Sequence, residues 1–384
     1  MTSWKYKKLD KISKREKIKK AQKLKASDKK EKKDFSLLDQ KQWDDYIKQG
    51  YFCARVVEVH KNYAFISPEP KELAIDNEDV WLATVAKKFL QNVRQERNFI
   101  TVGEKVLCLQ NTQSDKSEDL PQCTIEFRAP RRSQISRLDP LLKQREHVLA
   151  SNISQIIIVS SYLNPRVKWG LIDRYLVLAE HEHIKATIIF NKKDLLAESD
   201  KESFISLCED YEKLYKSLGY EVLSLQANKD KMDKKSEKAL KNLFKNHITL
   251  LSGHSGVGKS SITNLLKPDI IQEVEKDEIL TKGRHTTSYA SLLKIAKSSY
   301  IIDTPGIRSF VLKDTDALTL TWGFVEMRPY LNKCQFRECT HHNEPKCAVK
   351  DAVEEGSISK MRYQSYLGLL LGNTGREGKA TEES

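Results

Sequence analysis

The chain has 384 residues, enough for two or three domains with separate hydrophobic cores, and 31% of its residues are charged. No segment approaches the roughly eighteen consecutive apolar residues of a membrane-spanning helix. The N-terminus is charged from Lys5 onward and lacks the apolar segment of a secretion signal. We therefore expect a cytoplasmic protein without a membrane span.

The net charge of +13 is concentrated near the N-terminus. Residues 1–34 contain fourteen Lys and one Arg against five acidic residues, which accounts for ten of the thirteen net charges. Such a segment has little apolar surface to bury, so we expect the extension over residues 1–48 to be disordered or loosely helical and to bind polyanions without specificity. A solubilising extension without a target is the alternative. A mitochondrial presequence would favour Arg and avoid acidic residues, unlike this segment.

Residues 49–130 contain short runs of β-branched and aromatic residues separated by polar loops, for example YFCARVVEVH, NYAFIS, VLCLQN and CTIEFRA. About five strands within eighty residues predict a small antiparallel barrel, of either the OB or the SH3-like type. Residues 131–147 are rich in Arg and contain Pro140, so we expect a basic linker.

Residues 148–313 alternate apolar runs typical of buried parallel strands with helical segments, which predicts an α/β domain. The run GHSGVGKSS matches the phosphate-binding pattern G-x-x-x-x-G-K-[ST] between a predicted strand and a predicted helix. Its glycines let backbone N–H groups turn toward phosphate oxygens, its lysine places a cation on them, and its Ser260 hydroxyl can bind Mg²⁺. The expected contacts are Gly253, Ser255, Gly256, Val257, Gly258, Lys259, Ser260 and Ser261.

A second motif, DTPG, follows the apolar run SYIID. Asp303 lies where an acidic residue would reach Mg²⁺ through water, and the Gly306 amide can sense the terminal phosphate. Between the two motifs lies GRHTTS, where Thr286 or Thr287 would complete the Mg²⁺ shell. His285 beside them is a candidate catalytic residue or a solvated loop histidine.

The run FNKKDLL follows another predicted strand and precedes the phosphate loop. The carboxylate of Asp194 can accept hydrogen bonds from N1–H and the 2-amino group of guanine, which adenine lacks. Asn191 and Lys192 complete this base-reading motif. Ala227, after the next predicted strand, falls in a second loop expected to contact the base.

Residues 314–372 form a polar segment that ends in a predicted helix, and residues 373–384 form a tail. Within this segment Cys334, Cys339, His341 and Cys347 make a complete tetrahedral donor set with no open position. This set predicts one structural zinc ion, with His342 as a possible substitute for His341.

The motifs occur in an unusual order: base motif, base loop, phosphate loop, switch threonine and DTPG. This is the order of a GTPase domain opened between DTPG and the base motif. A parallel sheet tolerates the change because its ligand site forms at the carboxyl ends of the strands wherever the chain is cut. DTPG then leads directly into the zinc segment, which could therefore report whether GTP is bound.

This arrangement closely resembles the small ribosomal subunit biogenesis GTPases of the RsgA (YjeQ) family. The resemblance spans residues 50–370 and includes RRSQISR, SGVGKSS, GRHTT, DTPG, CQFRECTHHNEPKCAV and RYQSYL. It implies an OB-fold barrel, a circularly permuted P-loop GTPase domain and a C-terminal zinc domain with helices.

The resemblance also implies a function. The expected partners are GTP and GDP, the 30S subunit and its 16S rRNA, and the expected state is a monomer. Ribosome-stimulated hydrolysis would release the factor. Ile307 stands where many GTPases have a water-positioning Gln, so slow intrinsic turnover is expected, and His285 becomes the candidate catalytic residue with Lys259 and Asp303. Gln226 replaces the usual Ser of the base loop.

Two alternatives belong to other functional classes. One is an RNA-binding module in which GTP acts only as a clamp; the intact Lys259, Ser260 and Asp303 argue against it. The other is a P-loop ATPase, against which Asp194 argues.

Overall fold

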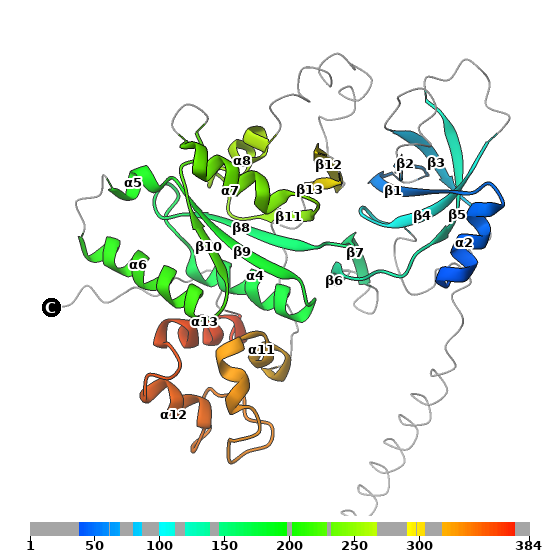
Figure 1. Cartoon of the computed structure of the whole chain (residues 1–384). Coiled ribbons are helices and arrows are strands. Elements are labelled where there is room, and N and C mark those ends of the chain that lie inside the picture. The colour runs from blue at the N-terminus through cyan, green and yellow to red at the C-terminus, as the bar shows by residue number, and fades with distance from the viewer. Residues whose placement is uncertain are drawn as a thin grey trace, which may run out of the picture.

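The computed structural model consists of a small barrel, a central α/β domain and a C-terminal helical domain, arranged in chain order (Figure 1). It describes residues 38–60, 62–69, 80–86, 100–111, 120–138, 146–197, 202–228, 232–266, 290–296, 298–303 and 317–372. Most of the basic extension, together with His285, Thr286, Thr287, Gly306 and the C-terminal tail, lies outside these residues.

The barrel confirms the predicted five strands and has the OB-fold topology. The strands pair in the order β1-β2-β3-β5-β4, and pairing of β1 with β4 closes the barrel. β3 and β5 are parallel, while the other neighbours are antiparallel. The strands are β1 (Phe52–Val59), β2 (Ala64–Pro68), β3 (Trp81–Val85), β4 (Lys105–Gln110) and β5 (Gln122–Arg128).

One helix packs against the barrel. α2 (Gln40–Lys48) begins with a capping box, in which Asp39 and Gln42 satisfy each other's backbone N–H groups. Its Trp43 is buried in the barrel core, beside Cys53. The apolar face of this helix therefore belongs to the barrel core rather than to the basic extension.

The segment expected to be a basic linker contains regular structure. β6 (Gln134–Leu138) pairs antiparallel with β7 (Glu146–Ser151). Before β6, the Arg131 guanidinium lies 2.6 Å from Glu104, whose side chain is fully buried. Because a buried carboxylate is costly without a cation, this ion pair holds the segment against the barrel.

The central sheet confirms the permuted order. Its strands lie in the order β10-β9-β8-β11-β13-β12, parallel except for β12. The phosphate-loop strand β11 thus lies between β8, which precedes it in the chain, and β13, which follows it. The strands are β8 (Gln155–Ser161), β9 (Lys185–Asn191), β10 (Glu221–Ser224), β11 (Ile248–Ser252), β12 (Ser291–Ala296) and β13 (Ser299–Asp303).

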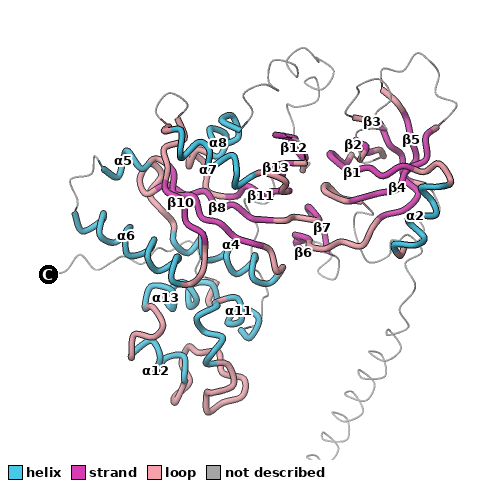
Figure 2. Tube along the Cα trace, in the orientation of Figure 1, coloured by secondary structure: helices cyan, strands magenta, loops and turns pink. Residues whose placement is uncertain are grey.

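Helices cover both faces of this sheet (Figures 1 and 2). Along β8, Ile156 and Ile158 pack in the same core as α4 and α6, whereas Ile157 and Val159 pack with α7 and α8. This alternation follows from the two-residue period of a strand. The helices are α4 (Trp169–His181), α5 (Lys193–Ala197), α6 (Glu202–Ser217), α7 (Lys234–Phe244) and α8 (Lys259–Leu266).

The C-terminal domain packs on α4. Its elements are α11 (Ala317–Gly323), the 3-10 helix η5 (Val325–Tyr330), α12 (Ala348–Glu354) and α13 (Lys360–Leu370). Gly323 approaches α4 so closely that a Cβ there would lie 2.6 Å from Val177. Fully buried Arg362 places its guanidinium 2.5 Å from Asp173 on α4 and 2.6 Å from Glu326 on η5.

None of the helices in the described part of the chain combines the length and the apolar character needed to cross a membrane.

Candidate nucleotide and metal sites

The phosphate loop connects the end of β11 to the start of α8, as predicted. Lys259 folds back over the loop, and its Nζ donates hydrogen bonds to the backbone oxygens of Gly253 (2.9 Å) and His254 (2.7 Å). Gly258 has a φ of +98°, and a Cβ there would lie 2.1 Å from the Asn191 side chain. Only glycine fits both that backbone conformation and that contact.

Asn191 joins three of the predicted segments. Its buried side chain donates from Nδ2 to the Val257 oxygen of the phosphate loop (2.9 Å). Its Oδ1 accepts from the Ala227 amide of the base loop (2.8 Å). The Ala227 amide therefore fixes the base loop through Asn191, and its contact with the base stays a prediction.

The surroundings of Asp194 fit its predicted role in reading guanine. It lies in the first turn of α5, immediately after the base-reading strand. Its Oδ1 is buried and has no hydrogen-bond partner within the described structure. A buried carboxylate oxygen without a donor is costly, so the site fits a ligand that brings N–H donors, as guanine does.

A loop outside the predicted motifs supports the base motif. The Nζ of Lys192 donates to the Asn164 oxygen (2.5 Å), in the loop between β8 and α4. Pro165 of the same loop lies against the phosphate loop, 3.7 Å from the Cβ position of Gly256. The sequence signal was the Asn-Pro dipeptide directly after a buried strand, which favours a turn.

The predicted Mg²⁺ residues come from neighbouring elements. Ser260 lies in the first turn of α8, and Asp303 is the last residue of β13, the strand paired with β11. β12, which begins four residues after Thr287, pairs Ser291 with Asp303. His285, Thr286, Thr287 and Gly306 lie outside the described residues, so their roles stay predictions.

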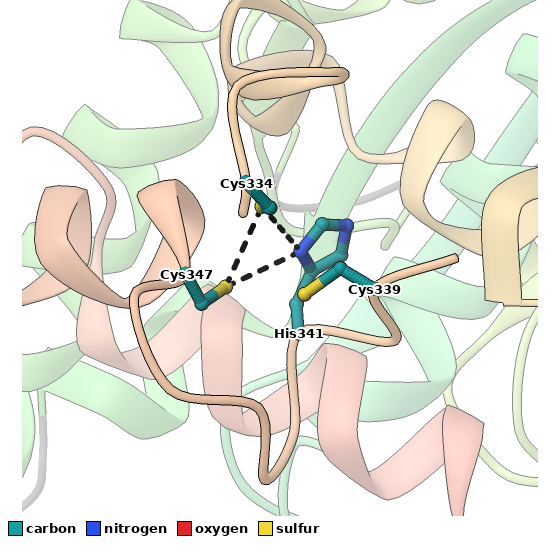
Figure 3. Close-up of side chains that lie close together, drawn as sticks. All are labelled: Cys334, Cys339, His341 and Cys347. Atoms are coloured by element: carbon teal, nitrogen blue, oxygen red, sulfur yellow. Dashed lines mark hydrogen bonds between the residues drawn. The ribbon is translucent and has the colours of Figure 1, made fainter. Parts of the chain in front are cut away.

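The four predicted metal ligands converge in the C-terminal domain (Figure 3). The Cys334 sulfur lies 3.8 Å from that of Cys347, and the His341 Nδ1 lies 3.5 and 3.4 Å from these two sulfurs. All four ligand atoms, including the Cys339 sulfur, lie within 4.8 Å of one another. Tetrahedral zinc with bonds of about 2.3 Å to sulfur and 2.0 Å to nitrogen requires edges of about 3.8 Å and 3.5 Å, so the donor set fits zinc.

The surrounding structure distinguishes His341 from His342. The His341 oxygen accepts from the Tyr363 hydroxyl of α13 (2.6 Å), whereas the His342 amide donates to Glu344 (3.0 Å). The imidazole of His341, not that of His342, belongs to the cluster. Burial raises the pKa of the Cys339 thiol to about 12 and lowers the pKa of His341, because without a cation the uncharged forms are favoured.

The strand order, the phosphate loop at β11 and the guanine motif at β9 define a circularly permuted P-loop GTPase. Between its barrel and its Cys₃His domain, residues 128–313 match the family model described as RsgA GTPase. The chain belongs to this family, the RsgA GTPases, and is a GTPase.

Relatives and solved structures agree with this assignment. A Flavobacterium psychrophilum protein named small ribosomal subunit biogenesis GTPase RsgA is 34% identical over 289 residues, covering 74% of this chain and 84% of the relative. A Haemophilus influenzae protein of the same name is 37% identical over 280 residues, covering 73% and 77%.

The crystal structure of YjeQ from Thermotoga maritima superposes with a TM-score of 0.63 at 28% identity, covering 85% of this chain and all of that one. The structure titled YloQ, a circularly permuted GTPase, superposes with a TM-score of 0.60 at 23% identity. The superposition covers 86% of this chain and 97% of that one, and it supports the fold.

We predict that Asp194→Asn weakens GTP binding about 100-fold or more, because the amide brings a donor where guanine also donates. Binding of xanthosine triphosphate, which has an acceptor at that position, should improve. Isothermal titration calorimetry with each unlabelled nucleotide measures both affinities. Asp210→Asn, exposed on α6 and paired with Lys213 at 3.8 Å, is the matched control and should change neither affinity. Unaltered GTP affinity in Asp194→Asn would contradict base reading by this carboxylate.

Cys347→Ser is expected to lower bound zinc from about one per chain to near zero, because three ligands and a weak hydroxyl no longer close the tetrahedral set. Elemental analysis of the purified chain measures this ratio. Cys208→Ser alters another fully buried thiol, outside the cluster, and should leave the zinc content unchanged. Equal zinc content in the two variants would remove Cys347 from the site.

Proposed function

We propose that this GTPase is a late assembly factor of the 30S ribosomal subunit. It binds 16S rRNA on the nearly mature subunit, and subunit-stimulated GTP hydrolysis triggers its release. The observation that carries this proposal is the permuted GTPase domain between an OB barrel and a Cys₃His domain, in a chain whose relatives are named for small ribosomal subunit biogenesis.

Each part of the chain then has a role. The OB barrel, residues 49–130, and the zinc domain, residues 314–372, contact rRNA, while the GTPase domain, residues 148–313, binds GTP and GDP. One zinc ion holds the loops of the C-terminal domain. We place the protein in the cytoplasm as a monomer.

The chemistry follows from the nucleotide site. Lys259 holds the β- and γ-phosphates against the loop amides, and Asp194 with Lys192 holds the base. Mg²⁺, bound through Ser260, Asp303 and Thr286 or Thr287, would neutralise charge that develops on the phosphates. His285 would orient the attacking water, because Ile307 has no hydrogen-bonding group for that task.

The zinc domain is suited to report the nucleotide state. Thirteen residues, 304–316, separate the end of β13 from the start of α11, so DTPG and the zinc domain are adjacent in the sequence. The domain also packs on α4, whose preceding loop contacts Lys192 and the phosphate loop. Two connections therefore link nucleotide binding to the position of the zinc domain: the chain that follows DTPG, and the packing of the domain on α4.

The test is multiple-turnover phosphate release with and without 30S subunits. Subunits should stimulate GTP hydrolysis about tenfold or more, as activating partners of other GTPases do. ATP should neither be hydrolysed nor compete. Absence of stimulation by active subunits would refute the ribosomal role, and release of a single phosphate per chain would support a clamp instead of an enzyme.

A further inference from the structure

α7 has an unusual concentration of positive charge on its exposed surface. Between residues 234 and 245 the chain contains five lysines and one acidic residue, Glu237. All five lysines are exposed. By contrast α6, on the other face of the sheet, has four acidic residues and two lysines.

Four of these lysines form one row. Lys234, Lys238 and Lys241 lie in α7, and Lys245 is its C-cap residue. Their spacing of four, three and four residues places them along one side of the helix and its C-terminal end. The row, here called the lysine stripe, extends over about 16 Å of helix axis. Leu240 and Phe244 are buried against the sheet from another side of the helix, so the stripe faces solvent.

Among the described residues, three of the four stripe lysines form no ion pair with an acidic side chain, unlike the two lysines of α6. On α6, Lys213 and Lys216 pair with Asp210 (3.8 Å) and Glu212 (3.4 Å). Within the part of the chain that the structure describes, Lys241 is the stripe lysine that forms an ion pair, with Glu237 at 2.6 Å. Like charges at i and i+4, as in the pairs Lys234–Lys238 and Lys241–Lys245, repel one another, so the arrangement costs helix stability.

The N-terminal end of α7 adds to this cost. Lys234 and Lys235 occupy the first turn, where the helix dipole disfavours cations. The N-cap Asp233 compensates by accepting from the Lys235 and Ser236 amides at 3.0 and 2.9 Å. A helix that keeps cations against its own dipole is expected to use them for an external anion.

The stripe is separate from the two domains proposed to bind rRNA. α7 packs on the face of the central sheet opposite to α4, and α4 carries the zinc domain (Figure 2). α7 begins shortly after the base loop that contains Ala227. An anion bound here would contact the GTPase domain on a face that neither the barrel nor the zinc domain occupies.

We propose that the lysine stripe is a further RNA-contact surface, which binds the phosphate backbone of a double-stranded RNA segment without reading its sequence. This inference rests on the proposed function, because it assumes that the protein works on structured RNA. A row of cations about 5.5 Å apart along the axis suits a chain of phosphates. The stripe has no aromatic side chain on which unpaired bases would stack, so it fits a duplex.

The test compares the triple variant Lys234→Gln, Lys238→Gln, Lys245→Gln with the wild-type chain. Lys241 is kept because of its ion pair. Affinity is measured for 30S subunits and for a random-sequence RNA duplex at several salt concentrations. The affinity of the variant should fall about tenfold or more at low salt. The salt slope, meaning the slope of log K against the logarithm of the salt concentration, should become smaller in magnitude by about two to three, which is near one per lost phosphate contact. GTP turnover without subunits should be unchanged and shows that the variant is folded.

The matched control removes three other lysines: Lys185→Gln, Lys213→Gln, Lys216→Gln. These lie outside α7 and pair with acidic residues, so the control loses the same net charge without touching the stripe. It should keep the wild-type affinity and salt slope. Equal losses in the two triple variants would mean that net charge alone acts, and would overturn the proposal.

Other outcomes separate this inference from the proposed function. Suppose that the wild-type chain binds 30S subunits, and that the stripe variant binds both the subunits and the duplex with the wild-type affinities. The stripe proposal then fails, while the ribosomal role stands. If the wild-type chain does not bind subunits, the ribosomal role fails and the duplex measurement still decides the stripe. If the stripe variant loses binding to polyglutamate but keeps its binding to the duplex and to 30S subunits, the stripe binds an acidic protein and the RNA assignment is overturned.

Discussion

Lys259→Ala is expected to reduce kcat/KM for GTP about 1000-fold, the largest effect of any single substitution in the nucleotide site. The Lys259 ammonium is held by two loop oxygens, at 2.9 and 2.7 Å, so it is oriented before substrate arrives. Charge that develops on the phosphates would meet a cation that is already in position, so little reorganisation is needed at the moment of reaction. Alanine removes this cation, so the backbone oxygens of Gly253 and His254 lose their hydrogen-bond donor and the phosphates lose their positively charged partner.

Steady-state phosphate release, together with binding of a fluorescent GDP analogue, measures this loss. Lys213→Ala removes an exposed lysine of the same domain and should change turnover by less than about twofold, because exposed ion pairs contribute little. A Lys259→Ala variant that keeps more than a tenth of the wild-type kcat/KM would show that the phosphate loop does not work as proposed.

Arg362→Met is expected to destabilise the packed GTPase and zinc domains by about 3–5 kcal/mol. Arg362, Asp173 and Glu326 are almost entirely buried, and Asp173 also accepts from the Tyr215 hydroxyl at 2.8 Å. Methionine fills much of the same volume but leaves two buried carboxylates without their cation. The loss therefore comes from uncompensated charge rather than from a cavity.

Two further variants identify this cause. Adding Asp173→Asn and Glu326→Gln to Arg362→Met removes the uncompensated charges and should restore a large part of the stability. Arg328→Met breaks a partly exposed pair with Glu180 at the same domain contact and should cost about 1 kcal/mol or less. Urea unfolding of the full chain provides the comparison. Equal destabilisation by Arg362→Met and Arg328→Met would contradict the buried-charge explanation.

The zinc site and the domain contact are joined by one helix. On α13, Arg362 reaches Asp173 of the GTPase domain, while Tyr363 and Tyr366 donate to the backbone oxygens of His341 (2.6 Å) and Thr340 (2.7 Å). The metal-binding loop and α4 are thus held by neighbouring residues of the same element. Loss of zinc is expected to loosen the contact with the GTPase domain as well as the loop itself.

The chemistry-bearing motifs were predictable from the sequence because each depends on residue type at a fixed short spacing. The phosphate loop needs Gly258 and Lys259 side by side, and the four predicted zinc ligands lie within one short segment, between Cys334 and Cys347. The permuted order was equally readable, because it is a property of the chain and not of its packing. The continuous apolar runs of strands such as β8 likewise predicted a sheet covered on both faces.

The tertiary structure alone decided how these parts meet. The strand pattern left the barrel between OB and SH3-like types, and the family resemblance implied the OB type. Pairing of β1 with β4 and of β3 with β5 confirmed it. The sequence around Asn191 predicted a base-reading residue, but nothing in it indicated that this side chain joins the base loop to the phosphate loop. Arg362 and Asp173 are 189 residues apart. Such contacts have no local spacing or periodicity, because they form only when separate elements bury their surfaces against one another.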